Sequence, residues 1–230
     1  MSQIAQTIER VKSSLPQGVR LVAVSKTHPV SFIREAYDCG QRDFGENKVQ
    51  EMSEKALALP KDIRWHMIGH LQTNKVKYIV PFVHLIHSVD TPKLLAIIDK
   101  EAKKVGRVID CLFQVHVAAE LTKFGFAPDE LLRYLDEGSF KELSNVRIRG
   151  IMAMATNTDN RGQVAVEFDR AHSIFEDVRE RFFAGADLFS LLSMGMSGDY
   201  DIAVQHGSNI VRVGSLIFGQ RDYSEKNNRL

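Results

Sequence analysis

The sequence alternates eight short apolar runs with segments in which apolar residues recur every three or four positions. The runs are rich in Val, Ile and Leu and end in polar residues, which is typical of strands buried on both faces of a sheet. We predict strands over residues 19–26, 42–47, 64–69, 83–89, 111–117, 146–153, 188–193 and 209–214. Alternation of strands with helices implies parallel pairing through right-handed crossovers.

The intervening segments carry helical periodicity and helix-terminating residues. We predict helices over residues 4–15, 31–40, 48–59, 75–80, 93–104, 128–135, 163–183 and 200–205. This pattern in 230 residues fits an α/β fold, a single (β/α)8 barrel with an extra N-terminal helix. Residues 1–230 would then form one domain, with 224–230 as a frayed polar tail. The alternative architecture is an open, doubly wound sheet.

Composition excludes several classes of partner. The net charge of +1 gives no field that would attract nucleic acid or an anionic membrane. No apolar stretch approaches the roughly 20 residues needed to span a bilayer, and the N-terminus lacks the basic start of a signal peptide. Cys39 and Cys111 lie far apart, which fits a reducing compartment. We therefore expect a cytoplasmic protein.

Lys26 closes the first apolar run and is the first candidate for chemistry. Taken alone, it reads most simply as a solvated lysine at the end of a strand. Barrels of this kind, however, place their sites at the carboxyl ends of their strands. An amine at that position could therefore act as a nucleophile, because burial beside an apolar strand favours its neutral form.

Two further strand ends carry small residues suited to binding phosphate. The seventh strand ends in Met194-Gly195-Met196-Ser197-Gly198, and the eighth ends in Gly214-Ser215. Such loops expose backbone N–H groups and hydroxyls, and the loops after strands seven and eight often bind phosphate in barrels. Gly-Ser pairs are also ordinary turn residues, so the argument depends on both motifs occurring together.

A lysine combined with two loops suited to binding phosphate suggests pyridoxal 5′-phosphate (PLP), which forms a Schiff base with an amine. Arg212 is a candidate partner for the ring nitrogen of PLP. Because arginine only donates hydrogen bonds, it would keep that nitrogen unprotonated and weaken the ring as an electron sink. The alternative for Arg212 is an ion pair in the barrel core.

A metal-dependent hydrolase is a third possibility, since the chain has eight histidines. On a strand, however, His66 and His70 would lie about 13 Å apart. His84 and His87 are three residues apart and should point to opposite faces. We therefore predict no metal site.

Several motifs, in register along nearly the whole chain, match a known family. They are AVSK (23–26), FGENKVQE (44–51), WHMIGHLQTNK (65–75), HSVD (87–90), KFG (123–125), GIMA (150–153), LSMGMS (192–197) and VRVGS (211–215). With these motifs the chain resembles the pyridoxal-phosphate homeostasis proteins (the YggS/PROSC type), whose barrel is similar to the N-terminal domain of bacterial alanine racemase.

The resemblance implies a set of PLP-binding residues. Lys26 would hold PLP as a Schiff base, Arg212 would face the ring nitrogen, and Ser197, Gly214 and Ser215 would contact the phosphate. The motifs also add other residues to the predicted site: Asn47, His66 and Met196. Three positions depart from the family pattern, namely His70, where Pro is usual, His116 and Thr156. These departures affect the expected rim of the site and none of the residues named above.

The resemblance further implies a protein that buffers or delivers PLP in vitamin B6 homeostasis, without established catalytic turnover and with PLP-dependent apo enzymes as possible recipients. The alternative is a PLP-dependent amino-acid racemase. Racemases of this fold take a second proton-transfer group from a C-terminal β-domain, and this chain ends soon after the eighth predicted strand, so we expect a non-catalytic protein. We also expect a monomer, because no apolar segment remains once the barrel is built.

Overall fold

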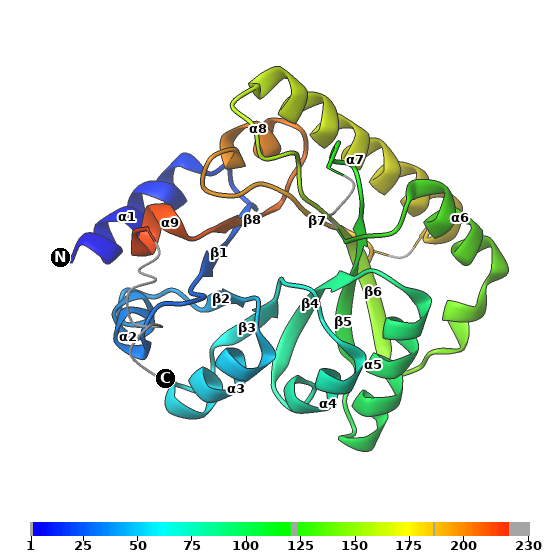
Figure 1. The fold of residues 1–230 in the computed structure, drawn as a ribbon, viewed down its shortest axis with the longest axis horizontal. Coiled ribbons are helices and arrows are strands. Elements are labelled where there is room, and N and C mark those ends of the chain that lie inside the picture. Colours follow the sequence, from blue (N-terminus) through cyan, green and yellow to red (C-terminus); the bar gives the residue numbers. More distant parts are fainter. Residues whose placement is uncertain (1, 121–123, 186, 221–230) are drawn as a thin grey trace.

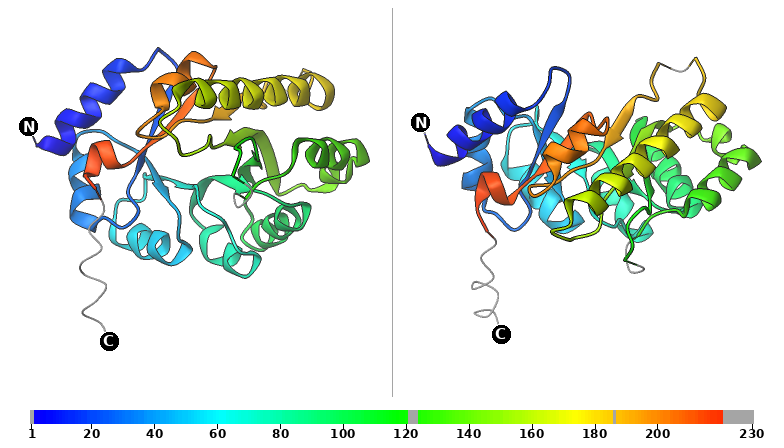
Figure 2. Two further views of the ribbon diagram at one scale, coloured as in Figure 1. Left: turned by 45° about the horizontal axis from the view of Figure 1, so that its top comes forward. Right: turned by 90° about the horizontal axis from the view of Figure 1, so that it is seen from above.

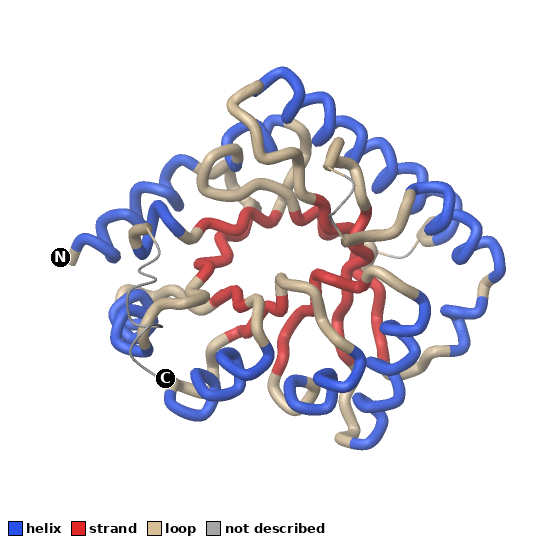
Figure 3. Tube along the Cα trace, in the orientation of Figure 1, coloured by secondary structure: helices blue, strands red, loops and turns tan. Residues whose placement is uncertain are grey.

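Eight parallel strands, β1 to β8, close into a barrel in sequence order. The computed structural model describes residues 2–120, 124–185 and 187–220. The strands form an inner ring that helices surround (Figure 3). The closed sheet confirms the predicted (β/α)8 barrel and rejects the alternative, an open doubly wound sheet. The tail 224–230 and Lys123 lie outside the described residues.

The elements follow the predicted order closely. The strands are β1 Arg20–Val24, β2 Asp43–Glu46, β3 Arg64–Met67, β4 Val83–Val89, β5 Ile109–Val115, β6 Val146–Ala153, β7 Leu191–Ser193 and β8 Ile210–Val213. The α-helices are α1 Gln3–Ser14, α2 Val30–Asp38, α3 Val49–Ala58, α4 Val76–Ile79, α5 Pro92–Lys104, α6 Pro128–Glu137, α7 Arg161–Phe182, α8 Tyr200–Gln205 and α9 Ser215–Phe218. Two 3-10 helices, η1 Thr73–Lys75 and η2 Ser139–Glu142, complete the described part of the chain.

The extra N-terminal helix packs where the barrel closes. α1 contacts α2 and the short α9, which follows the last strand (Figures 1 and 2). The Ser2 side chain accepts a hydrogen bond from the backbone N–H of Ala5 and caps the N-terminus of α1. Ile4, Ile8 and Val11 form its buried face. The one-turn α9, Ser215–Phe218, was not predicted.

Two apolar clusters fill the molecule. A large cluster lies between the barrel and the helices. A smaller one consists of five buried residues, Val22, Leu85, Leu112, Met152 and Ile210. Because successive side chains of a strand point to opposite faces, positions two residues beyond an interior residue also face the barrel axis. Three residues lie two positions after a member of the smaller cluster: Gln114, Met154 and Arg212. Lys26 lies four positions after Val22.

The register of β4 is irregular. Its pairing with β3 shifts between Trp65 and His66, and its pairing with β5 shifts between Ile86 and Val89. Such bulges insert an extra residue and locally break the alternation of side chains. This irregularity decides where the histidines of β4 point.

Candidate functional site

A cavity of about 490 Å³ opens at the carboxyl ends of the strands. It brings together every predicted cofactor residue except His66: Lys26, Asn47, Met196, Ser197, Arg212, Gly214 and Ser215. These residues come from the ends of β1, β2, β7 and β8, which are far apart in sequence. This is the face on which barrel enzymes and binding proteins carry their sites.

Lys26 reaches the cavity through a local backbone feature. Val24, two residues earlier, also lines the cavity, as the alternation of β1 requires. Thr27 has a φ of 69°, which is unusual for a β-branched residue. Its backbone N–H donates to Glu51 Oε1 at 2.5 Å, and its hydroxyl donates to the Lys26 carbonyl oxygen at 2.5 Å. These bonds hold the sharp turn that follows the lysine.

The two loops predicted to bind phosphate lie against each other. Ser197 Oγ accepts the backbone N–H of Gly214 at 3.1 Å. A side chain at position 214 would place its Cβ 3.0 Å from the Val24 carbonyl oxygen, so glycine lets the loop approach β1. Ser215 is the first residue of α9, where a backbone N–H has no acceptor within the helix. The two loops thus present small residues and backbone donors at one edge of the cavity.

Arg212 is buried in the barrel and lines the cavity from below. One of its terminal nitrogens, NH1, donates to the Ser193 carbonyl oxygen at 2.8 Å and to Ser193 Oγ at 2.6 Å. The other, NH2, donates to the Ala153 carbonyl oxygen at 3.0 Å. Burial lowers the pKa of Arg212 to about 10, so it remains a cation at neutral pH. The core ion pair considered from the sequence is absent among the described residues, where neutral oxygens hold the guanidinium.

Asn47 forms a wall of the cavity. Its backbone packs so closely on Gly69 that a Cβ at position 69 would lie 2.6 Å from the Asn47 carbonyl oxygen. Its side-chain Oδ1 is buried and accepts no hydrogen bond from the described residues. A buried acceptor without a donor is costly, and this one lies in the wall of a cavity large enough for a ligand.

The rim contains one of the three positions that depart from the family pattern. His70 lines the cavity, donates from Nδ1 to Asp90 Oδ2 at 2.9 Å, and stacks on Phe124 with 4.0 Å between ring centroids. His116 instead bonds the Glu120 carbonyl oxygen through Nε2. Thr156 joins the end of β6 to Glu167 of α7. Only His70 is therefore placed to touch a ligand.

Other lining residues were not predicted individually. They include Ile68, Gln114, Met154 and Asn157. Strand alternation could have identified Ile68 and Met154, because each lies two residues beyond an inward-facing residue on its strand. Asn157 lies in a loop, where no periodicity indicates direction.

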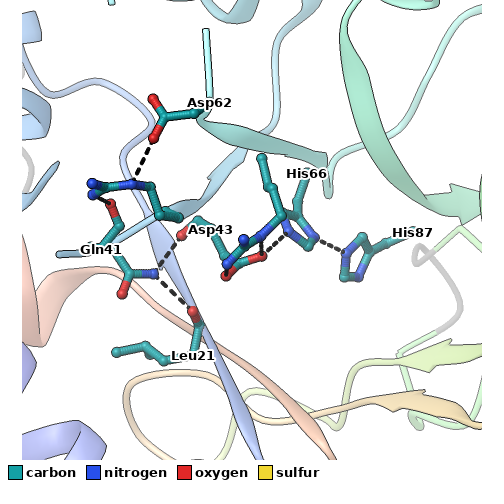
Figure 4. Close-up of polar contacts among 8 residues, drawn as sticks. Leu21, Gln41, Asp43, Asp62, His66 and His87 are labelled. Atoms are coloured by element: carbon teal, nitrogen blue, oxygen red, sulfur yellow. Dashed lines mark hydrogen bonds and ion pairs between the residues drawn. The ribbon is translucent and has the colours of Figure 1, made fainter. Parts of the chain in front are cut away.

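His66 does not line the cavity, contrary to its predicted place in the site. It is fully buried in the middle of β3. Its Nε2 lies 3.0 Å from Asp43 Oδ1, and its Nδ1 lies 2.9 Å from His87 Nε2 (Figure 4). The physical reason is its depth along β3, since Ile68 and Gly69, further along the chain, occupy the cavity wall.

The spacing argument against a histidine cluster was wrong. His84 and His87 both lie beside the His66 ring, with centroids 5.5 and 5.2 Å away, because the bulges in β4 break the alternation. Ligand atoms of Asp43, His66 and His84 all lie within 4.8 Å of one another. Arg64, however, already binds both carboxylate oxygens of Asp43, at 2.8 and 2.5 Å. That neighbouring positive charge disfavours a metal cation.

The chain is similar to characterised proteins over almost its full length. The family model described as alanine racemase, N-terminal domain, matches residues 1–222. Proteins named pyridoxal phosphate homeostasis protein are similar to it. That of Aquifex aeolicus is 38% identical, covering 96% of this chain and 98% of the relative. That of Homo sapiens is 37% identical, covering 97% and 85%.

A solved structure is also similar. PipY of Synechococcus elongatus, determined with PLP bound, is 37% identical and superposes with a TM-score of 0.84. The match covers 94% of this chain and 100% of PipY. In the described part of this chain, no helix has the length and apolar character needed to cross a membrane.

Proposed function

We propose how this chain, which belongs to the pyridoxal phosphate homeostasis proteins of the alanine racemase N-terminal domain family, holds its cofactor. Members of the family act in PLP homeostasis, and PLP is the cofactor of this chain. The observation that carries the proposal is that Lys26, Arg212 and the loops of Ser197 and Ser215 line one cavity. PLP supplies an aldehyde that condenses with an amine and a ring that withdraws electrons.

In this proposal Lys26 holds PLP covalently as a Schiff base. The phosphate lies against Ser197, Gly214 and Ser215, whose loops are joined by the bond from Gly214 N–H to Ser197 Oγ. Met196 lines the cavity on the same side. The unpartnered Asn47 Oδ1 supports the fit, because a ligand donor there would satisfy a buried acceptor.

Arg212 supports a storage or delivery role more than catalysis. The guanidinium stays cationic and can only donate, so a ring nitrogen facing it must accept and stay unprotonated. An unprotonated ring is a weaker electron sink, which disfavours the carbanion chemistry of PLP enzymes. We therefore propose a non-catalytic carrier that buffers PLP or passes it to PLP-dependent apo enzymes.

The proposal extends to the state of the protein in the cell. The two described cysteines, Cys39 and Cys111, are free thiols, which fits the reducing cytoplasm. The large apolar side chains exposed in the described residues are spread over many elements, including α2, α3, α7 and α9. Dispersed apolar residues need no partner, so we propose a monomer. A rise in mass with concentration, measured by light scattering, would contradict this.

The deciding experiment is borohydride reduction of PLP-loaded protein followed by peptide mapping. We expect a pyridoxyl label on Lys26, no label in Lys26→Ala, and an unchanged label in the control Lys75→Ala. Lys75 lines a neighbouring hollow outside the cavity. A label on another lysine in the wild-type protein would overturn the assignment.

The racemase alternative is tested on the same preparations. Loss of optical activity of an added amino acid, abolished in Lys26→Ala, would establish catalytic turnover and defeat the carrier proposal. We expect no such loss beyond that produced by free PLP.

A further inference from the structure

A chain of hydrogen bonds runs through the barrel interior from Arg212 to Asp43. Arg212 donates to Ser193 Oγ at 2.6 Å, and Ser193 Oγ lies 3.0 Å from His87 Nδ1. His87 Nε2 lies 2.9 Å from His66 Nδ1, and His66 Nε2 lies 3.0 Å from Asp43 Oδ1. All five residues are buried. Figure 4 shows the half of this chain that joins His87, His66 and Asp43.

The two ends of the chain determine the direction of every bond in it. Arginine only donates, so Ser193 Oγ accepts from Arg212 and its own O–H is available for His87. The Asp43 carboxylate at the other end only accepts, so with both rings neutral His87 Nδ1 is unprotonated and accepts from Ser193. A neutral His87 carries its proton on Nε2 and donates to His66 Nδ1, which leaves His66 to donate from Nε2 to Asp43. Each step therefore has a single consistent arrangement.

The carboxylate end is anchored from outside the chain. Burial alone would raise the pKa of Asp43, but hydrogen bonds from Arg64 and His66 hold it well below its usual range. Asp43 is therefore an anion and accepts at every pH at which the protein is handled. Burial also lowers the pKa values of His66 and His87, which keeps both rings neutral, as the bond directions require.

We propose that His87 and His66 are positioning residues that orient Arg212 toward the cofactor ring through Ser193. The inference rests on the proposed function, in which Arg212 faces the ring nitrogen. With its O–H committed to His87, Ser193 presents only acceptor capacity to the guanidinium. Arg212 is thereby held against Ser193 and Ala153 in the wall of the cavity that it lines. Loss of the chain would leave the hydroxyl free to rotate and the guanidinium less fixed.

The first test uses wild-type protein without PLP. Nitrogen-15 NMR of labelled histidines distinguishes the protonated ring nitrogen from the unprotonated one. We expect His66 and His87 both to be neutral, with the proton on Nε2. A proton on Nδ1 of either residue, or an imidazolium at pH 7, would overturn the proposal. This result does not depend on whether Lys26 binds PLP, so it separates this inference from the proposed function.

The second test compares variants loaded with PLP. The readouts are the dissociation constant, the visible absorption band of the bound cofactor and its titration with pH. We expect about tenfold weaker binding in Ser193→Ala, since a hydrogen bond to a charged group is lost. We expect about threefold weaker binding in His87→Phe, which acts one residue further away. In both, the titration midpoint should move by about half a pH unit or more.

The controls separate positioning from packing. Ser193→Thr keeps the hydroxyl and should restore the wild-type band and titration. His84→Asn changes a histidine that also touches the His66 ring but lies outside the chain, and it should leave both readouts unchanged. If folded His87→Phe and Ser193→Ala bind PLP with the wild-type band and titration, the positioning role is wrong. If a variant fails to fold, the histidine tautomers measured in the wild-type protein still test the proposal.

Discussion

At the scale of single residues, Gly150 marks the closest approach of two strands. Its φ is 149°, and a Cβ there would lie 1.8 Å from the Leu191 carbonyl oxygen. A Cβ atom cannot lie so close to a carbonyl oxygen, so β6 and β7 would have to separate. The barrel wall at this point therefore depends on the absence of a side chain.

We expect Gly150→Ala to destabilise the protein by about 3 kcal/mol or more, in the range of severe overpacking and strain. Urea unfolding measures the loss. The matched control is Gly162→Ala in the first turn of α7, where the new Cβ would meet only Asn160 Oδ1 at 3.4 Å. That change should be neutral or stabilising by up to about 1 kcal/mol, because alanine favours the helix. Equal effects of the two substitutions would contradict the argument.

The buried His66 and His87 and the partly buried His84 make stability depend on pH. Burial lowers the pKa values of His66 and His87, and lowers that of His84 to about 4, whereas an unfolded histidine titrates near 6.5. Below about pH 6.5 the unfolded chain therefore binds more protons than the folded protein, and stability falls as pH decreases. The contribution of His84 is lost between about 6.5 and 4.

We expect the free energy of unfolding to fall between pH 7 and pH 4.5 by up to about 1.4 kcal/mol per pH unit for each buried histidine. Urea unfolding at several pH values gives the slope. His87→Asn should reduce the slope, and His172→Asn, which changes a partly exposed residue of α7, should not. A stability that is flat over this range would show that the rings titrate in the folded protein as they do in the unfolded chain.

At the scale of elements, a buried lysine joins α3 to the ends of β1 and β2. Lys55 Nζ donates to Glu46 Oε1 at 2.8 Å, to Glu51 Oε1 at 2.6 Å and to the Ser25 carbonyl oxygen at 2.8 Å. Glu51 in turn accepts the backbone N–H of Thr27. Burial raises the pKa of Glu46, while Lys55 opposes that shift. This cluster lies directly behind the turn that carries Lys26.

We expect Lys55→Met to destabilise the protein by about 3 kcal/mol, because it leaves Glu46 buried without a cation. The deficit should be larger at pH 8 than at pH 5, since Glu46 can take up a proton as pH falls. Adding Glu46→Gln to the Lys55→Met variant should recover part of the lost stability.

An exposed ion pair provides the comparison for this change. Lys104 pairs with Glu101, and its side chain is 57% exposed. Lys104→Met should cost less than about 1 kcal/mol. If Lys55→Met costs no more than Lys104→Met, the buried cluster does not hold α3 to the strand ends.

At the scale of the whole molecule, the cavity gathers residues from both ends of the chain, so occupancy should stabilise the entire barrel. At a PLP concentration 100 times the dissociation constant, linkage gives about 2.7 kcal/mol. For a chain of this size that corresponds to a rise in melting temperature of roughly 5–10 °C. Thermal unfolding with and without PLP measures it. Lys26→Ala should lose most of the rise, and Lys75→Ala should keep it.

The sequence by itself determined the barrel and most of the candidate site. Apolar runs and helical periods are local patterns, so they predicted the element order that the structure confirms. Strand alternation is also local, and it carries the inward direction from Val22 through Val24 to Lys26. The cavity includes Lys26, Arg212 and the two small-residue loops, because parallel strands bring their carboxyl ends to one face.

Only the tertiary structure decided what lies beneath the cavity. The family motif placed His66 in the site, and strand alternation separated His84 from His87, because a regular strand points successive side chains to opposite faces. The register shifts of β4 arise from its pairing with β3 and β5, which are distant in sequence, and they turn both histidines toward His66. Pairing between strands is a long-range property that no local period records. The chain from Asp43 to Arg212 therefore exists only once the barrel has closed.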